Sequence, residues 1–167
     1  LEFNLDNPVN YNNSGKYPLF ILLGCNAGNF YMFNTLRLQT KETISEKYVL
    51  APQRGSIGTI ASTHLGIVHY LDIYNSKNYS SFGVNKYNGT MGDAMVDAIT
   101  QTFNLTTQND FYARFHCEQT TLHGDPAIHL NGFPKPDYVI EENLVKLNPS
   151  FISVAETNFM VDAKFMN

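Results

Sequence analysis

Two short apolar runs stand out in the first half of the chain. They cover residues 19–23 and 57–61, and both have the length of a strand. A continuous apolar run bounded by turn residues is typical of a strand buried on both faces, as in a parallel sheet. Between the runs, Thr43 and Glu46 have the spacing of a capping box and predict a helix that ends near Pro52. Strand, helix and strand in this order predict a right-handed crossover unit.

The middle of the chain carries three helical signals, which cover residues 67–74, 91–103 and 111–122. The first predicts a short helix that gives way to a loop. The other two show apolar residues three or four positions apart, as expected for a helix with one buried face. Thr90 with Asp93, and Thr107 with Asp110, repeat the capping spacing. These acidic residues, like Glu46, are therefore explained by helix capping and need no catalytic role.

From Gly124 onward the chain shows signals of turns and strands instead of helices. Gly124-Asp125-Pro126 predicts a sharp turn, which residues 127–130 follow as a short strand. Residues 138–140 also have the composition of a strand. From Phe159 to Met166 apolar and polar residues alternate, which is typical of a half-buried strand. We therefore expect two domains, over residues 1–133 and 134–167.

Composition and charge narrow the expected partners. The 167 residues carry a net charge of −4, and the 11 basic residues are scattered singly. We expect no nucleic-acid partner, because no basic cluster is available to track phosphates. No apolar run approaches the roughly 20 residues that cross a bilayer, so no transmembrane segment is expected. The Asn-rich start has no signal-peptide pattern and the last strand has no partner, so we expect a fragment of a longer protein.

Two reactive side chains follow the predicted parallel strands. Cys25 comes after the first strand and His64 after the second, and the carboxyl ends of parallel strands share a crevice. A thiol attacks a carbonyl as the thiolate, so it needs an imidazole or another positive feature nearby. Gly24 and Gly28 would let a substrate backbone approach and leave amides free for an oxyanion hole. The alternative is that Cys25 is a small core residue.

Four motifs in chain order resemble the gingipain family of secreted bacterial cysteine peptidases. They lie at residues 24–30, at 45–46, at 55–63 and at 122–127. The resemblance covers about residues 16–130 and implies an α/β fold of the caspase-like (Rossmann-like) kind, with a mostly parallel sheet flanked by helices. Residues 134–138 and the final strand resemble the passage into an immunoglobulin-like β module. Such a chain would be located outside the bacterium or on its surface.

The resemblance also implies a site. Cys25 would be the nucleophile of a Cys-His dyad that hydrolyses protein or peptide substrates, and its own amide would be one oxyanion donor. The residues implied to contact substrate are Leu23, Gly24, Thr63, His64 and Val68. The best-known members carry an aromatic residue near the position of Val68, so their preference for Arg or Lys is not transferred. Substrate specificity is left open.

The family histidine lies upstream of the cysteine strand, and no histidine precedes Cys25. We expect that histidine in a missing amino-terminal part of a larger multidomain chain exported by a bacterial secretion machinery. Two alternatives stay open. His64 could be an in-chain base, or the domain could be a non-catalytic scaffold of a surface or secretion-cargo protein. The resemblance requires no cofactor and allows a structural calcium ion.

A second group, His116-Cys117-Glu118 with His123, has the residue types of a metal site. Adjacent residues on a helix point apart, however, so we expect no metal there. His123-Gly124 follows the cysteine instead of preceding it, and with Asp125 it predicts a structural turn.

Overall fold

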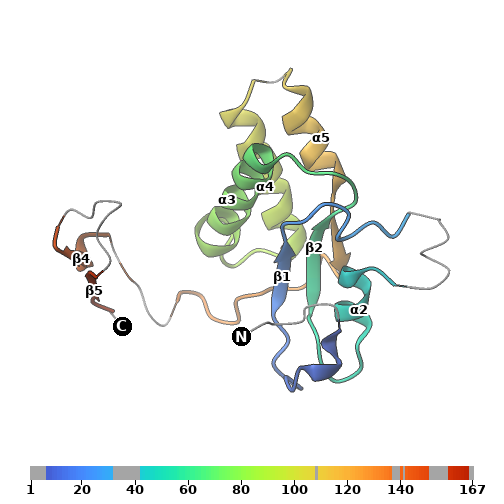
Figure 1. Ribbon diagram of the computed structural model, residues 1–167, viewed down its shortest axis with the longest axis horizontal. Helices are drawn as coiled ribbons and strands as arrows, with labels where there is room; N and C mark the ends of the chain where they lie inside the picture. Colours follow the sequence, from blue (N-terminus) through green and yellow to red (C-terminus); the bar gives the residue numbers. More distant parts are fainter. Residues whose placement is uncertain are drawn as a thin grey trace. The chain divides into compact units, whose positions relative to one another are not determined.

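A computed structural model describes residues 7–31, 42–107, 109–136, 140, 142–150 and 158–165. Contacts divide the chain into two compact units, Leu1–Gly132 and Phe133–Asn167, which are described one at a time (Figure 1). The domain identities expected from the sequence stay predictions. In the described part of the chain, no helix is both long and apolar enough to span a membrane.

The first unit alternates strands and helices. Its described elements are, in chain order, η1 (Pro8–Asn10), β1 (Leu19–Leu22), α2 (Ile44–Leu50), β2 (Gly58–Ser62), α3 (Val68–Ser80), η2 (Ser81–Asn85), α4 (Met91–Leu105), α5 (Phe111–Gln119) and β3 (Thr120–Gly124). The two strands expected in the first half and the helix between them are confirmed to within one or two residues at each end. The α/β class is confirmed with them.

The sheet of this unit has the order β1-β2-β3. β1 and β2 pair in parallel, with Leu19 opposite Gly58. All five residues of β2 are buried, so this strand forms the centre of the sheet. β3 pairs antiparallel to β2, with Ile60 opposite Leu122. The described sheet is therefore mixed instead of mostly parallel, and the caspase-like arrangement stays a prediction.

Different helices cover the two faces of the sheet (Figure 1). Phe20 packs edge-on against Tyr48 of α2, with ring centroids 4.9 Å apart. On the other face, a Cβ built on Gly58 would lie 3.5 Å from Met91 Sδ of α4. Tyr48, Ile60 and Met91 are each at most 2% exposed. The core thus runs through β2 and fixes the carboxyl ends of β1 and β2, where the predicted site residues lie.

Both capping boxes expected at the starts of α2 and α4 are confirmed. Thr43 Oγ1 accepts the Glu46 amide at 3.3 Å, and Glu46 Oε2 accepts the Thr43 amide at 2.7 Å. Thr90 and Asp93 make the equivalent pair at 3.1 and 3.0 Å. A side-chain cap of this kind is worth about 1 kcal/mol to a helix.

Two helical predictions are wrong in detail. Thr107 does not cap α5, because Asp110 is itself the N-cap and accepts the amides of Tyr112 and Ala113. α3 continues to Ser80 and into η2, beyond the short helix expected near residues 67–74. Its buried face carries Tyr74 and Asn78. Because helices in proteins owe most of their stability to tertiary packing, this buried pair explains why the helix continues beyond its predicted end.

The third strand lies earlier than expected. The helix expected over residues 111–122 is present but ends three residues early, and the prediction of a strand over residues 127–130 is wrong. α5 ends at Gln119 and β3 begins at Thr120, whose Oγ1 donates to the carbonyl of His116 at 2.7 Å. Two consecutive β-branched threonines favour the extended backbone there. Asp125 Oδ1 accepts the Ala127 amide at 2.9 Å, so the expected structural turn is present.

The second unit contains an antiparallel pair of strands. β4 (Val145–Asn148) follows η3 (Glu142–Leu144) and pairs with β5 (Met160–Ala163). β5 confirms a strand within residues 159–166, but three of its four residues are exposed instead of alternating with buried ones. β4 was not predicted, and its pairing with β5 shows that the expectation of a last strand without a partner is wrong. Tyr138 and Val139, from the other strand-like segment, lie outside the described residues. The immunoglobulin-like character of this unit stays a prediction.

Candidate active site

The loop after β1 carries Cys25 and turns back over the end of β2. The Asn26 amide donates to the carbonyl of His64 at 3.0 Å, and the Gly28 amide donates to the carbonyl of Ser62 at 2.9 Å. A Cβ on Gly28 would lie 2.8 Å from Ala61 Cβ, so only glycine allows this close approach. The cysteine loop is therefore held against the carboxyl end of the central strand.

The two cysteines have opposite environments. Cys25 is exposed and Cys117 is buried. The Gly66 amide points at Cys25 Sγ at 3.4 Å, and the sulfur lies 3.9 Å from the Gly66 carbonyl. Burial raises the pKa of Cys117 to about 11. The interpretation of Cys25 as a small core residue is therefore wrong, and it is the thiol that a substrate can reach.

The segment that faces the sulfur is residues 64–67, which we call the strap. Gln119 Nε2 donates to the carbonyl of Leu65 at 3.1 Å, and the Ile67 amide donates to His116 Nε2 at 2.8 Å. A Cβ on Gly66 would lie 2.5 Å from Leu71 Cδ1, so glycine lets the strap pack closely on α3. β2, α3 and α5 together fix the backbone of the strap beside Cys25.

The expected substrate-contact residues fall into two groups. Backbone bonds bring the loop with Gly24 together with the segment containing Thr63 and His64 at the ends of the parallel strands. Leu23 and Val68 flank these segments in the chain, with 54% and 81% of their surface exposed. The sequence reasoning missed Gln119 and His116. The sequence signal that could have indicated this segment is Gly66, a glycine shortly after the predicted strand over residues 57–61.

The histidines differ in what their rings can do. Both ring nitrogens of His116 are engaged, Nε2 by the Ile67 amide and Nδ1 by the Tyr112 carbonyl at 2.6 Å. His64 is exposed, and its ring packs edge-on against Phe115 with centroids 6.0 Å apart. The bonded neighbour of Cys25 Sγ is the Gly66 backbone. This geometry gives His64 no direct support as the base of a dyad.

His123 of β3 contacts Phe30, which follows the cysteine loop in the chain. Its ring packs edge-on against Phe30 with centroids 5.0 Å apart, and its Nε2 is buried without a hydrogen-bond partner in the described residues. Burial lowers the pKa of His123, while the negative charge of Glu46 opposes this shift. The neutral imidazole is therefore favoured in the folded protein.

We expect a pH dependence of stability that belongs to His123. With the folded pKa below the ordinary value of 6.5, the unfolded chain binds the proton more strongly. The free energy of unfolding should therefore fall as the pH decreases from about 6.5 towards 5. His123→Leu should flatten this part of the profile in urea denaturation measured between pH 7.5 and 5. Parallel profiles for the two proteins would contradict the assignment.

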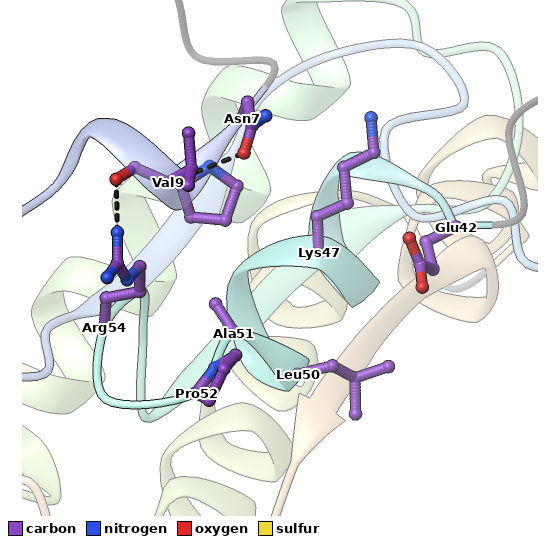
Figure 2. Close-up of a pocket in the computed structure, with 9 residues that line it drawn as sticks. Asn7, Val9, Glu42, Lys47, Leu50, Ala51, Pro52 and Arg54 are labelled. Carbon is purple, nitrogen blue, oxygen red and sulfur yellow. Dashed lines mark hydrogen bonds between the residues drawn. The ribbon is translucent and has the colours of Figure 1, made fainter.

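Two of the hollows in the first unit differ in whether they reach the candidate site. One, of about 380 Å³, is lined by Phe20, Ile21, Leu22, Leu23, Gly24, Ala27, Ile44 and Tyr48. It therefore extends along β1 to the residues that precede Cys25. Figure 2 shows the other, of about 440 Å³, between η1 and the end of α2. Arg54 donates to the carbonyl of Val9 there, and none of the expected site residues lines it.

The described residues do not form a metal site. In the described part of the chain, no cluster of three or more His, Cys, Asp or Glu side chains is placed to hold a metal ion. The structural calcium ion therefore stays a prediction.

A family model described as peptidase family C25 matches residues 2–131. No curated protein and no solved structure matches the chain.

Proposed function

The chain belongs to peptidase family C25, the gingipain family of cysteine peptidases, and from this premise we propose that Cys25 is its catalytic nucleophile. One observation carries the proposal. The exposed sulfur lies where two parallel strands end, with a backbone amide 3.4 Å away on Gly66. A thiolate needs access to substrate and a donor that stabilises its charge, and Cys25 has both.

The proposed reaction is hydrolysis of a peptide bond in two steps. The Cys25 thiolate attacks the substrate carbonyl, and the amide of Cys25 donates to the oxyanion that forms. A histidine protonates the leaving amine, and water then releases the acyl group from the sulfur. We place that histidine in a part of the protein that precedes Leu1. Among the described histidines, His116 has both nitrogens engaged and His64 packs on Phe115.

The surroundings of the thiol favour an apolar substrate residue before the scissile bond. From Thr63 to Leu71 the chain contains no Asp, Glu, Lys or Arg. The exposed apolar side chains of this region are Leu23, Leu65, Ile67 and Val68, between 43% and 81% exposed. A substrate Arg or Lys would find no carboxylate among these residues, whereas an aliphatic side chain would bury apolar surface.

The wider setting follows from the family. Members of this family are secreted or surface peptidases, so we propose the same location and protein or peptide substrates for this chain. We also propose that it is part of a larger exported multidomain protein. The chemistry of a thiol and an imidazole requires no cofactor.

Electrophilic peptide probes test both the nucleophile and the substrate class. An acyloxymethyl ketone with Leu at the reactive position should modify Cys25 in the whole protein stoichiometrically, leaving Cys117 unmodified. The matching Arg probe should react about tenfold more slowly. Val68→Asp should reverse part of this preference by supplying a carboxylate. Mass spectrometry of the labelled peptides, with and without prior iodoacetamide, measures each outcome.

The possible results separate the enzyme from a scaffold. Equal, slow labelling of Cys25 and Cys117 would show that Cys25 has no special reactivity and would favour a non-catalytic binding domain. Rapid labelling of Cys25 by the Arg probe would keep the nucleophile and reject the apolar preference.

A further inference from the structure

His116 is a buried histidine whose hydrogen bonds define its tautomer. It lies on α5 with 1% of its surface exposed. The carbonyl of Tyr112 can only accept a hydrogen bond, so the 2.6 Å contact places a proton on Nδ1. Nε2 accepts the Ile67 amide at 2.8 Å and must therefore carry the lone pair. The ring of Tyr70 stacks on the imidazole with centroids 5.3 Å apart and fixes its orientation.

The hydrogen bond between the Ile67 amide and His116 lies one residue along the chain from the Gly66 amide that contacts the thiol. Ile67 follows Gly66, whose amide lies 3.4 Å from Cys25 Sγ. On the other side of Gly66, the carbonyl of Leu65 accepts from Gln119, which is also on α5. One helix thus holds the strap at two points that flank the amide facing the sulfur.

We propose that His116 is a positioning residue for Cys25. It fixes the strap so that the Gly66 amide stays directed at the sulfur and stabilises its anion. The inference rests on the proposed function, in which that anion is the nucleophile. A side chain without an acceptor at this place would leave the Ile67 amide without its hydrogen-bond partner, so the strap would lose one of its two bonds to α5.

Replacing His116 by asparagine or by glutamine distinguishes its hydrogen bond to the strap from its hydrogen bond within α5. In His116→Asn, the short side chain should donate to the Tyr112 carbonyl, as Asn78 donates to the carbonyl of Tyr74 four residues earlier at 3.0 Å. It is too short to reach Ile67. In His116→Gln, Oε1 can lie near the former position of Nε2 and accept the Ile67 amide.

The rate at which the Leu probe modifies Cys25 in the whole protein is the test. We expect His116→Asn to lower this rate about tenfold to a hundredfold, because the reacting geometry is lost. His116→Gln should stay within about threefold of the wild type. Thr102→Val is the control for lost stability, because it removes the 2.8 Å bond from the buried Thr102 hydroxyl to the Ala98 carbonyl of α4 and the contact of this hydroxyl with Cys117, but no bond to the strap. Thermal unfolding is measured for each variant.

Each result is decisive. Rescue by glutamine, with a wild-type rate in Thr102→Val, supports the positioning role. A wild-type rate in His116→Asn overturns it, as does a rate for His116→Gln equal to that of His116→Asn at equal melting temperature. If the wild-type protein itself labels Cys25 no faster than Cys117, the proposed function fails and the inference fails with it.

Discussion

Replacing Cys25 by alanine should lower kcat/KM for peptide hydrolysis by at least about a thousandfold. The reason is that, in the proposed reaction, the sulfur forms the covalent bond to the substrate carbonyl, and alanine has no nucleophile to replace it. Cys25→Ser keeps nearly the same volume but presents a hydroxyl, so it should be almost equally inactive. The measurement is steady-state hydrolysis of a fluorogenic peptide by the whole protein.

The second cysteine supplies the matched control for this experiment. Cys117 is 5% exposed in α5, so Cys117→Ala should reduce stability slightly while leaving kcat/KM within a few-fold of the wild type. Unchanged hydrolysis by Cys25→Ala would remove the basis of the proposed function. Equal losses in the alanine variants of both cysteines would point to a folding effect instead.

Gly55→Ala should destabilise the first unit by about 3 kcal/mol or more. Gly55 has a φ of +88°, which a residue with a Cβ rarely adopts, and the added Cβ would lie 2.0 Å from the carbonyl oxygen of Tyr48. The side chain of Asn13 bonds both the amide and the carbonyl of Gly55, at 3.1 and 2.8 Å. The turn into β2 therefore cannot shift without breaking these bonds. Urea denaturation gives the change in the free energy of unfolding.

Gly83→Ala is the control for this substitution. Nothing lies within 4 Å of a Cβ built on Gly83, and alanine restricts the unfolded chain more than glycine does. We expect a change of no more than about 1 kcal/mol, in the stabilising direction. A loss of stability as large for Gly83→Ala as for Gly55→Ala would contradict the explanation by the clash at Tyr48, because a Cβ on Gly83 meets no such clash.

Local patterns predicted the first half of the fold well. The apolar runs gave β1 and β2, and the residue pair Thr43 and Glu46 gave the start of α2, because these signals act over a few residues. α3 and β3 were predicted poorly. The length of α3 depends on packing of Tyr74 and Asn78 against the rest of the unit, and β3 depends on pairing with β2. Neither interaction leaves a local pattern.

The sequence likewise predicted one part of the candidate site, the cysteine, and not another, the strap. Cys25 stood out because a glycine-rich motif follows an apolar strand, and the expected neighbour His64 does lie beside its loop through the Asn26 bond. The strap contacts were not predictable. His116 and Ile67 are 49 positions apart in the sequence, so their hydrogen bond arises only when α5 packs on the strap. For that reason the sequence indicated only a metal-ligand role for His116, and we expected no metal there.

The complete burial of β2 has a consequence for the dynamics of the molecule. All five residues pair with β3, and Gly58 to Ala61 also pair with β1. The amide protons of β2 should therefore exchange with deuterated solvent only when the whole unit opens. The backbone oxygens that anchor the cysteine loop belong to Ser62, the last residue of this strand, and to His64 just beyond it. The loop that carries Cys25, the proposed nucleophile, is thus attached to the part of the first unit that should open most slowly. Local opening elsewhere in the unit should leave the position of this loop unchanged.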